Sequence, residues 1–163
     1  MGKNKGEKTN QSNISPENYI KTRARNLPIG KCYINETWET IGFATIVVSR
    51  NHTNGNSTFA LFLVDTYCLG VKDTFFGFNQ YAELDEILGK LDVKEKMIEV
   101  EYPLAHNIIY GGVEYAAGFG FKPHKDFGIT QYLLEQDDDR VELIEIEFGL
   151  NGKPAILVGK ERH

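Results

Sequence analysis

The longest β-forming stretch of the chain is interrupted once, by a turn. FATIVVSR (43–50) and STFALFLVDTYCL (57–69) are rich in β-branched and aromatic residues, and NHTNGN between them contains an Asn-Gly pair. Asn-Gly adopts the positive φ angles of a tight turn at little cost, so the pattern predicts a long β-hairpin. The apolar residues of ALFLV are continuous, which is typical of a strand covered on both faces and therefore central in its sheet.

Three further segments have strand-like patterns. CYI (32–34) predicts a neighbour for the hairpin, and FFGF (75–78) predicts a further short strand or the edge of the sheet. VELIEIEF (141–148) alternates apolar residues with glutamates apart from its Leu-Ile pair, and LNGK after it predicts a turn onto PAILVG (154–159). We expect this second hairpin to turn a glutamate-lined face to water.

Helical patterns occupy the intervening segments. Ser15-Pro16 places serine at an N-cap and proline at the first helical position, which predicts a helix over 16–25. Apolar residues recur at helical spacing over 79–91 and over 103–117, and ITQYLLEQ (129–136) predicts a shorter helical piece.

Gly111-Gly112 lies in the middle of the predicted helix 103–117. Glycine inside a helix costs about 1 kcal/mol relative to alanine. A close backbone crossing or a bound ligand would explain the pair.

These elements contain no internal repeat and predict one α+β domain. We expect a mostly antiparallel sheet of five to six strands with two to three helices packed on it. A length of 163 residues is near the common size of a single domain. Residues 1–14 are polar and low in apolar content, so we predict a disordered tail there and the domain over 15–163.

Charge is unevenly distributed along the chain. Residues 1–31 carry seven Lys and Arg against two Glu, a balance of +5, which leaves −10 for residues 32–163 out of the total of −5. A basic segment of this kind is one candidate for binding nucleic acid. The alternative is a solvated polar tail on an acidic body that repels phosphate.

Cellular location follows from two absences in the sequence. No apolar run approaches the roughly 18 residues that span a bilayer, and MGKNKGEKTNQSN has no apolar core of a secretion signal. We therefore expect a cytoplasmic protein that does not bind membranes. Cys32 and Cys68 lie in apolar contexts, so we interpret them as buried free thiols; a reactive cysteine is the alternative.

The common cofactor and catalytic motifs are missing from the sequence. It contains no P-loop lysine motif, no G-x-G-x-x-G after a strand, no G-x-S-x-G and no H-E-x-x-H. Gly118-Phe119-Gly120 ends a predicted helix instead of opening one. No pair of ligands at i, i+4 or within a short loop supplies a metal site, so we predict neither a metal nor a cofactor.

Four stretches carry a resemblance. ENYIKTRARNLPIGKCYINETW, FLVDTYCLGVKD, AHNIIYGGVEYAAGFGFKPHKDF and LIEIEFGLNGKP together resemble an uncharacterised family of small bacterial proteins from Bacteroidetes-type genomes, over about residues 16–158. The resemblance implies a soluble bacterial protein. It implies no activity and carries over no catalytic residues.

The enzymatic candidates are His124, Asp126 and Lys72. A histidine can act as general acid or base and a lysine can stabilise a phosphorane-like charge, as metal-independent RNA cleavage requires. FKPHKDF is a polar loop after a helix, and LGVKD ends the long central strand. His106 opens the helix that His124 follows, so the two histidines share a site only if that helix breaks.

The remaining candidates are assigned to binding, each beside a structural alternative. Lys122 and Lys125 make the FKPHKDF loop locally basic, and Asp73 either adjoins the site or forms a surface ion pair. His106 either binds or is a satisfied polar residue at the core edge. Two arginines of the first helix either grip phosphate or an acidic partner or face solvent; they are Arg23 and Arg25.

Three functions follow from these patterns. The leading hypothesis is a non-enzymatic binding or accessory module with an unknown protein partner, because the chain has no dense catalytic constellation. The second is a small nucleic-acid- or nucleotide-processing hydrolase in a mobile-element or phage-defence context. The third is a nucleic-acid binder acting through residues 1–31. An apolar edge such as FFGF also suggests a homodimer.

Overall fold

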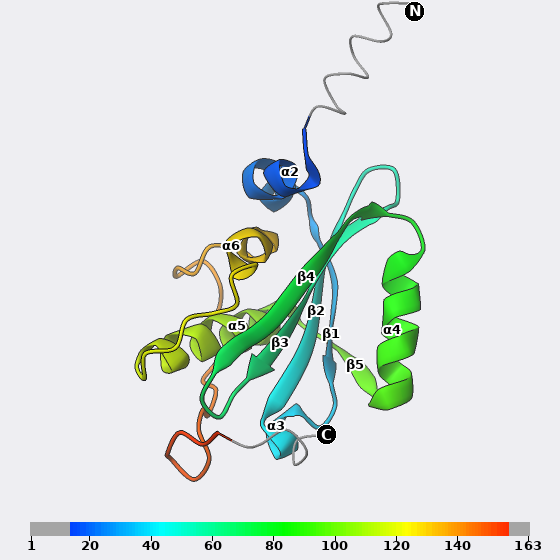
Figure 1. The fold of residues 1–163 in the computed structure, drawn as a ribbon. Coiled ribbons are helices and arrows are strands. Elements are labelled where there is room, and N and C mark those ends of the chain that lie inside the picture. Colours follow the sequence, from blue (N-terminus) through cyan, green and yellow to red (C-terminus); the bar gives the residue numbers. More distant parts are fainter. Residues whose placement is uncertain (1–13, 157–163) are drawn as a thin grey trace, which may run out of the picture.

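The computed structural model describes residues 14–156 as one sheet with helices on either side (Figure 1). The elements in order are α2 (Pro16–Arg23), η1 (Ala24–Asn26), β1 (Ile29–Asn35), α3 (Trp38–Ile41), β2 (Phe43–Asn51), β3 (Ser57–Asp65), β4 (Gly70–Gln80), α4 (Glu83–Lys94), β5 (Met97–Val100), α5 (Tyr102–Ala117), α6 (Phe127–Thr130) and η2 (Gln131–Leu133). The strands pair antiparallel in the order β4-β3-β2-β1-β5.

The α+β prediction is confirmed, with five strands in the sheet. The described residues hold five α-helices where two or three were expected, because α3 and α6 are single turns of four residues. Of the predicted tail 1–14, residues 1–13 lie outside the described part of the chain.

The predicted hairpin is the centre of the sheet. β2 and β3 pair from Phe43 and Asp65 to Asn51 and Ser57, and Gly55 in the turn has a φ of 90°. β3 lies between β2 and β4, and seven of its nine residues are buried, which confirms a strand covered on both faces. It ends at Asp65, earlier than predicted, because this carboxylate accepts the N–H groups of Tyr67 and Cys68 and forms a turn there.

The flanking strands confirm two predictions and add one element. The CYI segment lies in β1 beside β2, and FFGF lies in the edge strand β4. β5 was not predicted, since its four residues MIEV are too short to give a periodic signal of their own. It forms a strand because β1 offers it a pairing edge.

The main core lies between the sheet and α5. Figure 1 places α2, α5 and α6 on one side of the sheet and α4 on the other. Alternate residues of β2 and β3 face α5 and are fully buried, as are the residues of α5 that face the sheet. The strand residues are Ala44, Ile46, Val48, Ala60, Phe62 and Val64, and those of α5 are Ala105, Ile108 and Ile109. Burial of this kind contributes roughly 25 cal/mol per Å² of apolar surface removed from water.

The glycine pair in α5 marks two close crossings. A Cβ on Gly112 would lie 2.9 Å from Val64 Cγ1, and one on Gly70 would lie 2.8 Å from the Gly112 carbonyl oxygen. A Cβ on Gly111 would lie 2.7 Å from the ring of Phe148. One glycine therefore lets α5 approach the sheet, and the other lets the C-terminal segment approach α5.

Arg50 is a buried arginine at the end of β2, only 1% exposed. Its guanidinium donates to the carbonyl oxygens of Leu133 (2.8 Å) and Leu27 (2.8 Å) and to Glu135 Oε2 (3.0 Å). These bonds join the hairpin to the segment after α2 and to the segment after α6. The burial of this residue could not be read from its place at the end of an apolar run.

The prediction of a strand over 141–148 is wrong. Within residues 14–156 this segment belongs to no strand, although the turn after it forms, with a bridge between Leu150 and Lys153. Ile144, Ile146 and Phe148 are half-buried while the glutamates between them are exposed. The alternation reports the two sides of an extended backbone, and here the inner side packs on α5 instead of on a neighbouring strand. Of the predicted partner strand 154–159, residues 154–156 are not in a strand and the rest lie outside the described residues.

The predicted cysteine environment is confirmed. Cys32 and Cys68 are both buried and free. Burial raises the pKa of the Cys32 thiol to about 11, so it remains un-ionised near neutral pH.

Arg50→Met should destabilise the fold by about 3 kcal/mol, because it leaves buried carbonyl groups without donors. Urea unfolding measures this loss. Glu135→Gln is the matched control: its side chain is 38% exposed and the amide still accepts a bond, so we expect less than about 1 kcal/mol. Equal losses in both variants would show that the ion pair, and not the carbonyl contacts, is what Arg50 contributes.

Protonation of His52 should lower the stability of the fold at acidic pH. Its Nε2 lies 2.6 Å from Thr58 Oγ1, which itself accepts a bond from the Asn79 N–H, and its ring packs near Tyr19 and Phe78. Burial lowers the pKa of His52, so the unfolded chain takes up the proton first. Stability should be full above the ordinary histidine pKa of about 6.5 and decline as the pH falls through it. His52→Gln should lose less stability than the wild type between pH 7 and pH 5 in urea unfolding; an unchanged pH profile would contradict this assignment.

Candidate functional site

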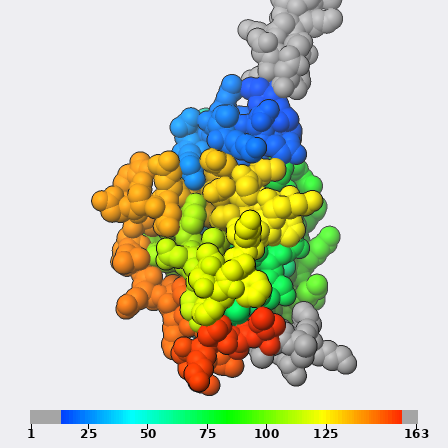
Figure 2. Space-filling view, turned by 60° about the vertical axis from the view of Figure 1, so that its left-hand side comes forward, coloured from blue at the N-terminus to red at the C-terminus, as the bar shows by residue number. Residues whose placement is uncertain are grey.

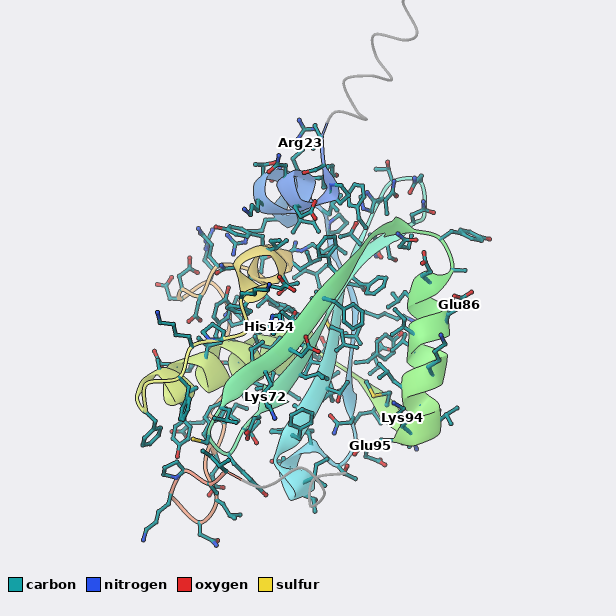
Figure 3. The ribbon with its side chains drawn as sticks, in the orientation of Figure 1. Arg23, Lys72, Glu86, Lys94, Glu95 and His124 are labelled. Carbon is teal, nitrogen blue, oxygen red and sulfur yellow. The ribbon has the colours of Figure 1, made fainter. Side chains whose placement is uncertain are left out.

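The loop that carries His124 returns from α5 to the edge strand of the sheet. The His124 N–H donates to the Val71 carbonyl (2.9 Å), which brings the FKPHKDF and LGVKD segments together as the site hypothesis requires. Figure 3 labels Lys72 and His124 on this flank of the molecule. Lys72 is the extra residue of a β-bulge, because Val71 pairs with Val64 and Asp73 with Leu63. The bulge leaves Lys72 and Asp73 exposed side by side.

His124 itself is enclosed by carboxylates. Its Nε2 lies 3.7 Å from Asp73 Oδ1 and its Nδ1 lies 3.8 Å from Asp126 Oδ2. The Asp126 backbone N–H donates to Nδ1 (3.1 Å), so Nδ1 acts as an acceptor and a ring proton on Nε2 faces Asp73. His124 thus caps the turn that leads into α6, as an asparagine does in an Asx turn.

The cluster brings together His124, Asp126, Asp73 and the backbone beside Lys72. Lys122 and Lys125 lie in the same loop and are exposed. Two carboxylates beside one imidazole oppose the approach of a phosphate, and the lysines are not directed by any hydrogen bond in the described part of the chain. The geometry supplies a capping histidine and lacks the second histidine of an acid–base pair.

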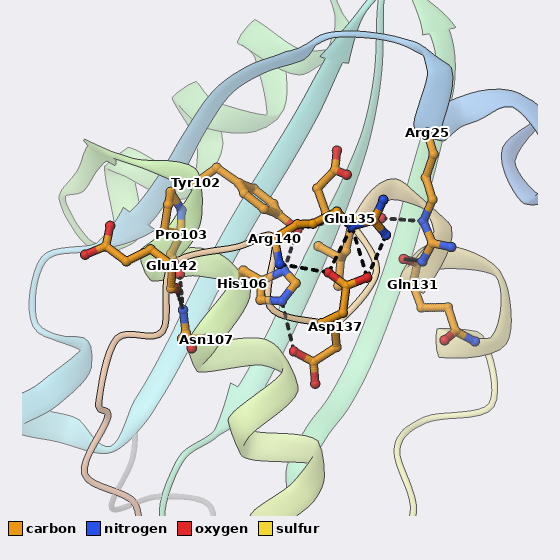
Figure 4. A network of polar contacts seen from close by, with 12 residues as sticks. Arg25, Tyr102, Pro103, His106, Asn107, Gln131, Glu135, Asp137, Arg140 and Glu142 are labelled. Atoms are coloured by element: carbon orange, nitrogen blue, oxygen red, sulfur yellow. Dashed lines mark hydrogen bonds and ion pairs between the residues drawn. The ribbon is translucent and has the colours of Figure 1, made fainter.

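His106 belongs to a different cluster, at the start of α5 (Figure 4). α5 is helical from Tyr102 to Ala117 without a break at its glycines, so the two histidines do not meet. Tyr102 Oη accepts the Glu135 N–H (2.7 Å) and lies 2.7 Å from His106 Nδ1, while His106 Nε2 lies 3.1 Å from Asp137 Oδ1. Each of these contacts is a hydrogen bond when the Tyr102 hydroxyl donates to Nδ1 and the Nε2–H of His106 donates to Asp137.

The cluster around His106 is structural in character. The His106 side chain is 2% exposed, and burial raises the pKa of the Tyr102 hydroxyl above its ordinary range. Its hydrogen bonds fasten residues 135–137 to α5. The alternative of a satisfied polar residue at the core edge therefore describes His106 better than a binding role.

The two predicted arginines differ in their contacts. Arg25 donates to the carbonyl oxygens of Leu134 (2.7 Å) and Gln131 (3.4 Å), and its guanidinium lies 4.9 Å from the centre of the Tyr132 ring. These bonds attach the Arg25 side chain to η2 and to the residue after it. Arg23 is exposed, with its guanidinium 5.9 Å from the Tyr19 ring.

Two adjoining clefts lie beside α5, away from the predicted catalytic residues. One of about 210 Å³ is formed by α5 and residues 143–148, and one of about 480 Å³ is formed by η1, η2 and residues 136–138. Tyr110 and Asp137 line both. Of the residues predicted for function, Arg25 lines the second cleft and none lines the first.

We define the ribbon as residues 141–148, the extended segment on the outer side of α5. Leu143 at its start is 85% exposed, and Phe148 near its end stacks on Tyr115, with ring centres 5.6 Å apart. Phe119, 47% exposed, contacts the other edge of Tyr115 at 5.2 Å. In Figure 2 the residues that follow α5, coloured from yellow to red, lie around the yellow-green atoms of α5.

The sequence did not indicate an exposed binding segment at 141–148, because the alternation of apolar residues and glutamates there predicted a strand. The acidic character was visible: residues 136–147 hold six carboxylates and one arginine. Arg140 donates to Asp138 and lowers the pKa of that carboxyl to about 2, so it remains charged. Residues 136–147 are therefore strongly negative, and we call this face of the molecule, with the exposed side chains of Leu143 and Phe119, the ribbon side.

Comparison with known proteins gives no match to a family model, to a curated protein or to a solved structure. The resemblance to a Bacteroidetes-type family stays a prediction, as do the cytoplasmic location and a dimer through β4. Among residues 14–156, no helix combines the length and the apolarity needed to cross a membrane. The same residues contain no cluster of three or more His, Cys, Asp or Glu side chains arranged to hold a metal.

His124→Ala should lower stability by about 1 kcal/mol, the usual effect of removing a cap. His124→Asn is the matched control, because its side-chain oxygen can accept the Asp126 N–H and should restore most of the loss. Thermal unfolding measures both. An asparagine variant as unstable as the alanine variant would show that the cap is not what His124 contributes.

Proposed function

We propose that the protein is a non-enzymatic binding module that docks a partner protein on its ribbon side. The observation that carries the proposal is the ribbon itself, an extended segment held on α5 outside the sheet, with an almost fully exposed leucine. Contiguous exposed apolar side chains rimmed by polar ones mark protein-binding surfaces.

The arrangement of the ribbon favours docking over a loop that only covers the core. Its inner side chains already pack on α5, where Gly111 leaves room for Phe148. Its outer side therefore presents Leu143 and the glutamates to solvent without a structural task of their own. An aromatic neighbour, Phe119, extends the apolar area beyond the ribbon.

The hydrolase alternative receives less support from the contacts. His124 accepts a backbone hydrogen bond and has carboxylates near both ring nitrogens. Phosphate cleavage needs positive charge at the reacting group, which this arrangement opposes. Nucleic-acid binding through residues 1–31 also loses one candidate, because Arg25 is committed to backbone carbonyls.

Leu143→Asp should weaken partner binding at least tenfold, as expected from losing the burial of one leucine, about 1.5 kcal/mol or more. Val93→Asp is the matched control, because Val93 is 87% exposed on α4, on the opposite side of the sheet. The measurement is quantitative co-purification of the wild-type partner with each variant from the native host, followed by titration of the purified pair.

Equal binding by the two variants would contradict docking on the ribbon side. Unchanged melting temperatures are expected for both, because neither side chain is buried. Cleavage of labelled RNA or DNA by the wild type that is lost in His124→Asn would support the hydrolase instead.

A further inference from the structure

We infer that the ribbon binds its partner by pairing, strand to strand, with an extended basic segment of that partner. This inference rests on the proposed docking role and specifies its mode and chemistry.

The backbone of residues 143–148 is extended and open. Within the described part of the chain, none of its N–H or C=O groups makes a hydrogen bond to protein. The ends are fixed: the Glu142 carbonyl accepts Asn107 Nδ2 (2.9 Å), and the Gly149 N–H donates to the Thr66 carbonyl (2.9 Å). A segment anchored at both ends and unpaired between them is a template for an added strand.

The open segment has the length of a short added strand. A strand of six residues is about 20 Å long, at roughly 3.3 Å per residue, which matches the length of the open segment. The fixed ends reduce the entropy that the ribbon loses on binding.

The outer side chains specify the chemistry of the partner strand. Glu145 and Glu147 are exposed and two residues apart, so they lie on one side of the ribbon, together with Leu143. Directly opposite pairs in a sheet favour unlike charges by up to about 1 kcal/mol each. The complementary strand therefore carries Lys or Arg at two alternate positions and an apolar residue at the next.

A second copy of this chain is disfavoured as the occupant. Antiparallel pairing of two ribbons would place glutamates near glutamates, and like charges across a strand pair are destabilising. Nucleic acid is disfavoured for the same electrostatic reason. A basic peptide segment is the occupant that fits both the backbone and the charge.

The test uses a fluorescein-labelled synthetic peptide, acetyl-KVKVRV-amide, titrated into the full-length protein by fluorescence anisotropy. Two further peptides of the same sequence carry N-methyl groups at alternate peptide nitrogens, either at the odd or at the even positions. Only one of these sets faces the ribbon in a strand pair, so one peptide should bind at least tenfold more weakly and the other should bind like the parent. Hydrogen exchange should slow at amides within 143–148 when the parent peptide is added.

A protein variant tests the charge separately. Glu145→Lys with Glu147→Lys should bind the basic peptide at least tenfold more weakly and should bind acetyl-EVEVEV-amide instead. Lys90→Glu with Lys94→Glu on α4 is a control for changes in exposed charge away from the ribbon, and should leave the parent titration unchanged.

The outcomes separate the mode of binding from the docking role. Equal binding by both N-methyl peptides, with weakening only in the charge variant, would overturn strand pairing and leave the docking role intact. The inference would be overturned if the parent peptide did not bind up to millimolar concentration. It would also be overturned if the changes at Glu145 and Glu147 left binding unaffected. In either case the Leu143→Asp experiment with the native partner still tests the docking role by itself. Concentration-dependent dimerisation lost in the charge variant would assign the ribbon to a second copy.

Discussion

The buried guanidinium of Arg50 is the contact on which the rest of the arrangement depends. It extends from the end of β2 and holds carbonyl groups from the segments after α2 and after α6. Without it, the central hairpin would still pair but would lose its hydrogen bonds to both segments, which Arg25 would still join to each other. Because a buried charge must be satisfied by hydrogen bonds, its geometry fixes the positions of the segments that surround it.

Positioning of the ribbon follows from that attachment. Glu135, which receives one of the Arg50 bonds, is adjacent to the residues that His106 and Tyr102 fasten to α5. The chain therefore leaves the core at a fixed place and direction before it reaches residue 141. The two glycines of α5 complete the arrangement, one by admitting the sheet and the other by admitting Phe148.

The histidines illustrate how the same residue type serves different ends. His124 accepts a backbone bond at an exposed turn, His106 links a tyrosine to a carboxylate at the core edge, and His52 bonds Thr58 beside the hairpin turn. In each case at least one ring nitrogen contacts a polar group at a turn or in a distant part of the chain. A polar network of this kind specifies a unique packing of loops, which suits a scaffold that presents a docking surface.

Local periodicity and turn chemistry were enough to predict the hairpin, the class of the fold and the main helices. The contact between the LGVKD and FKPHKDF segments is tertiary, because it joins residues far apart in the chain. Period-two alternation over 144–148 also correctly separated inner from outer side chains, whereas Leu143, grouped with the apolar inner residues, is exposed. That α5, and not another strand, covers the inner side depends on the packing of the folded chain, since alternation carries no information about what lies alongside. Burial of Arg50, the unbroken path of α5 and the contacts of each histidine likewise depend on residues far apart in the chain, which no local pattern records.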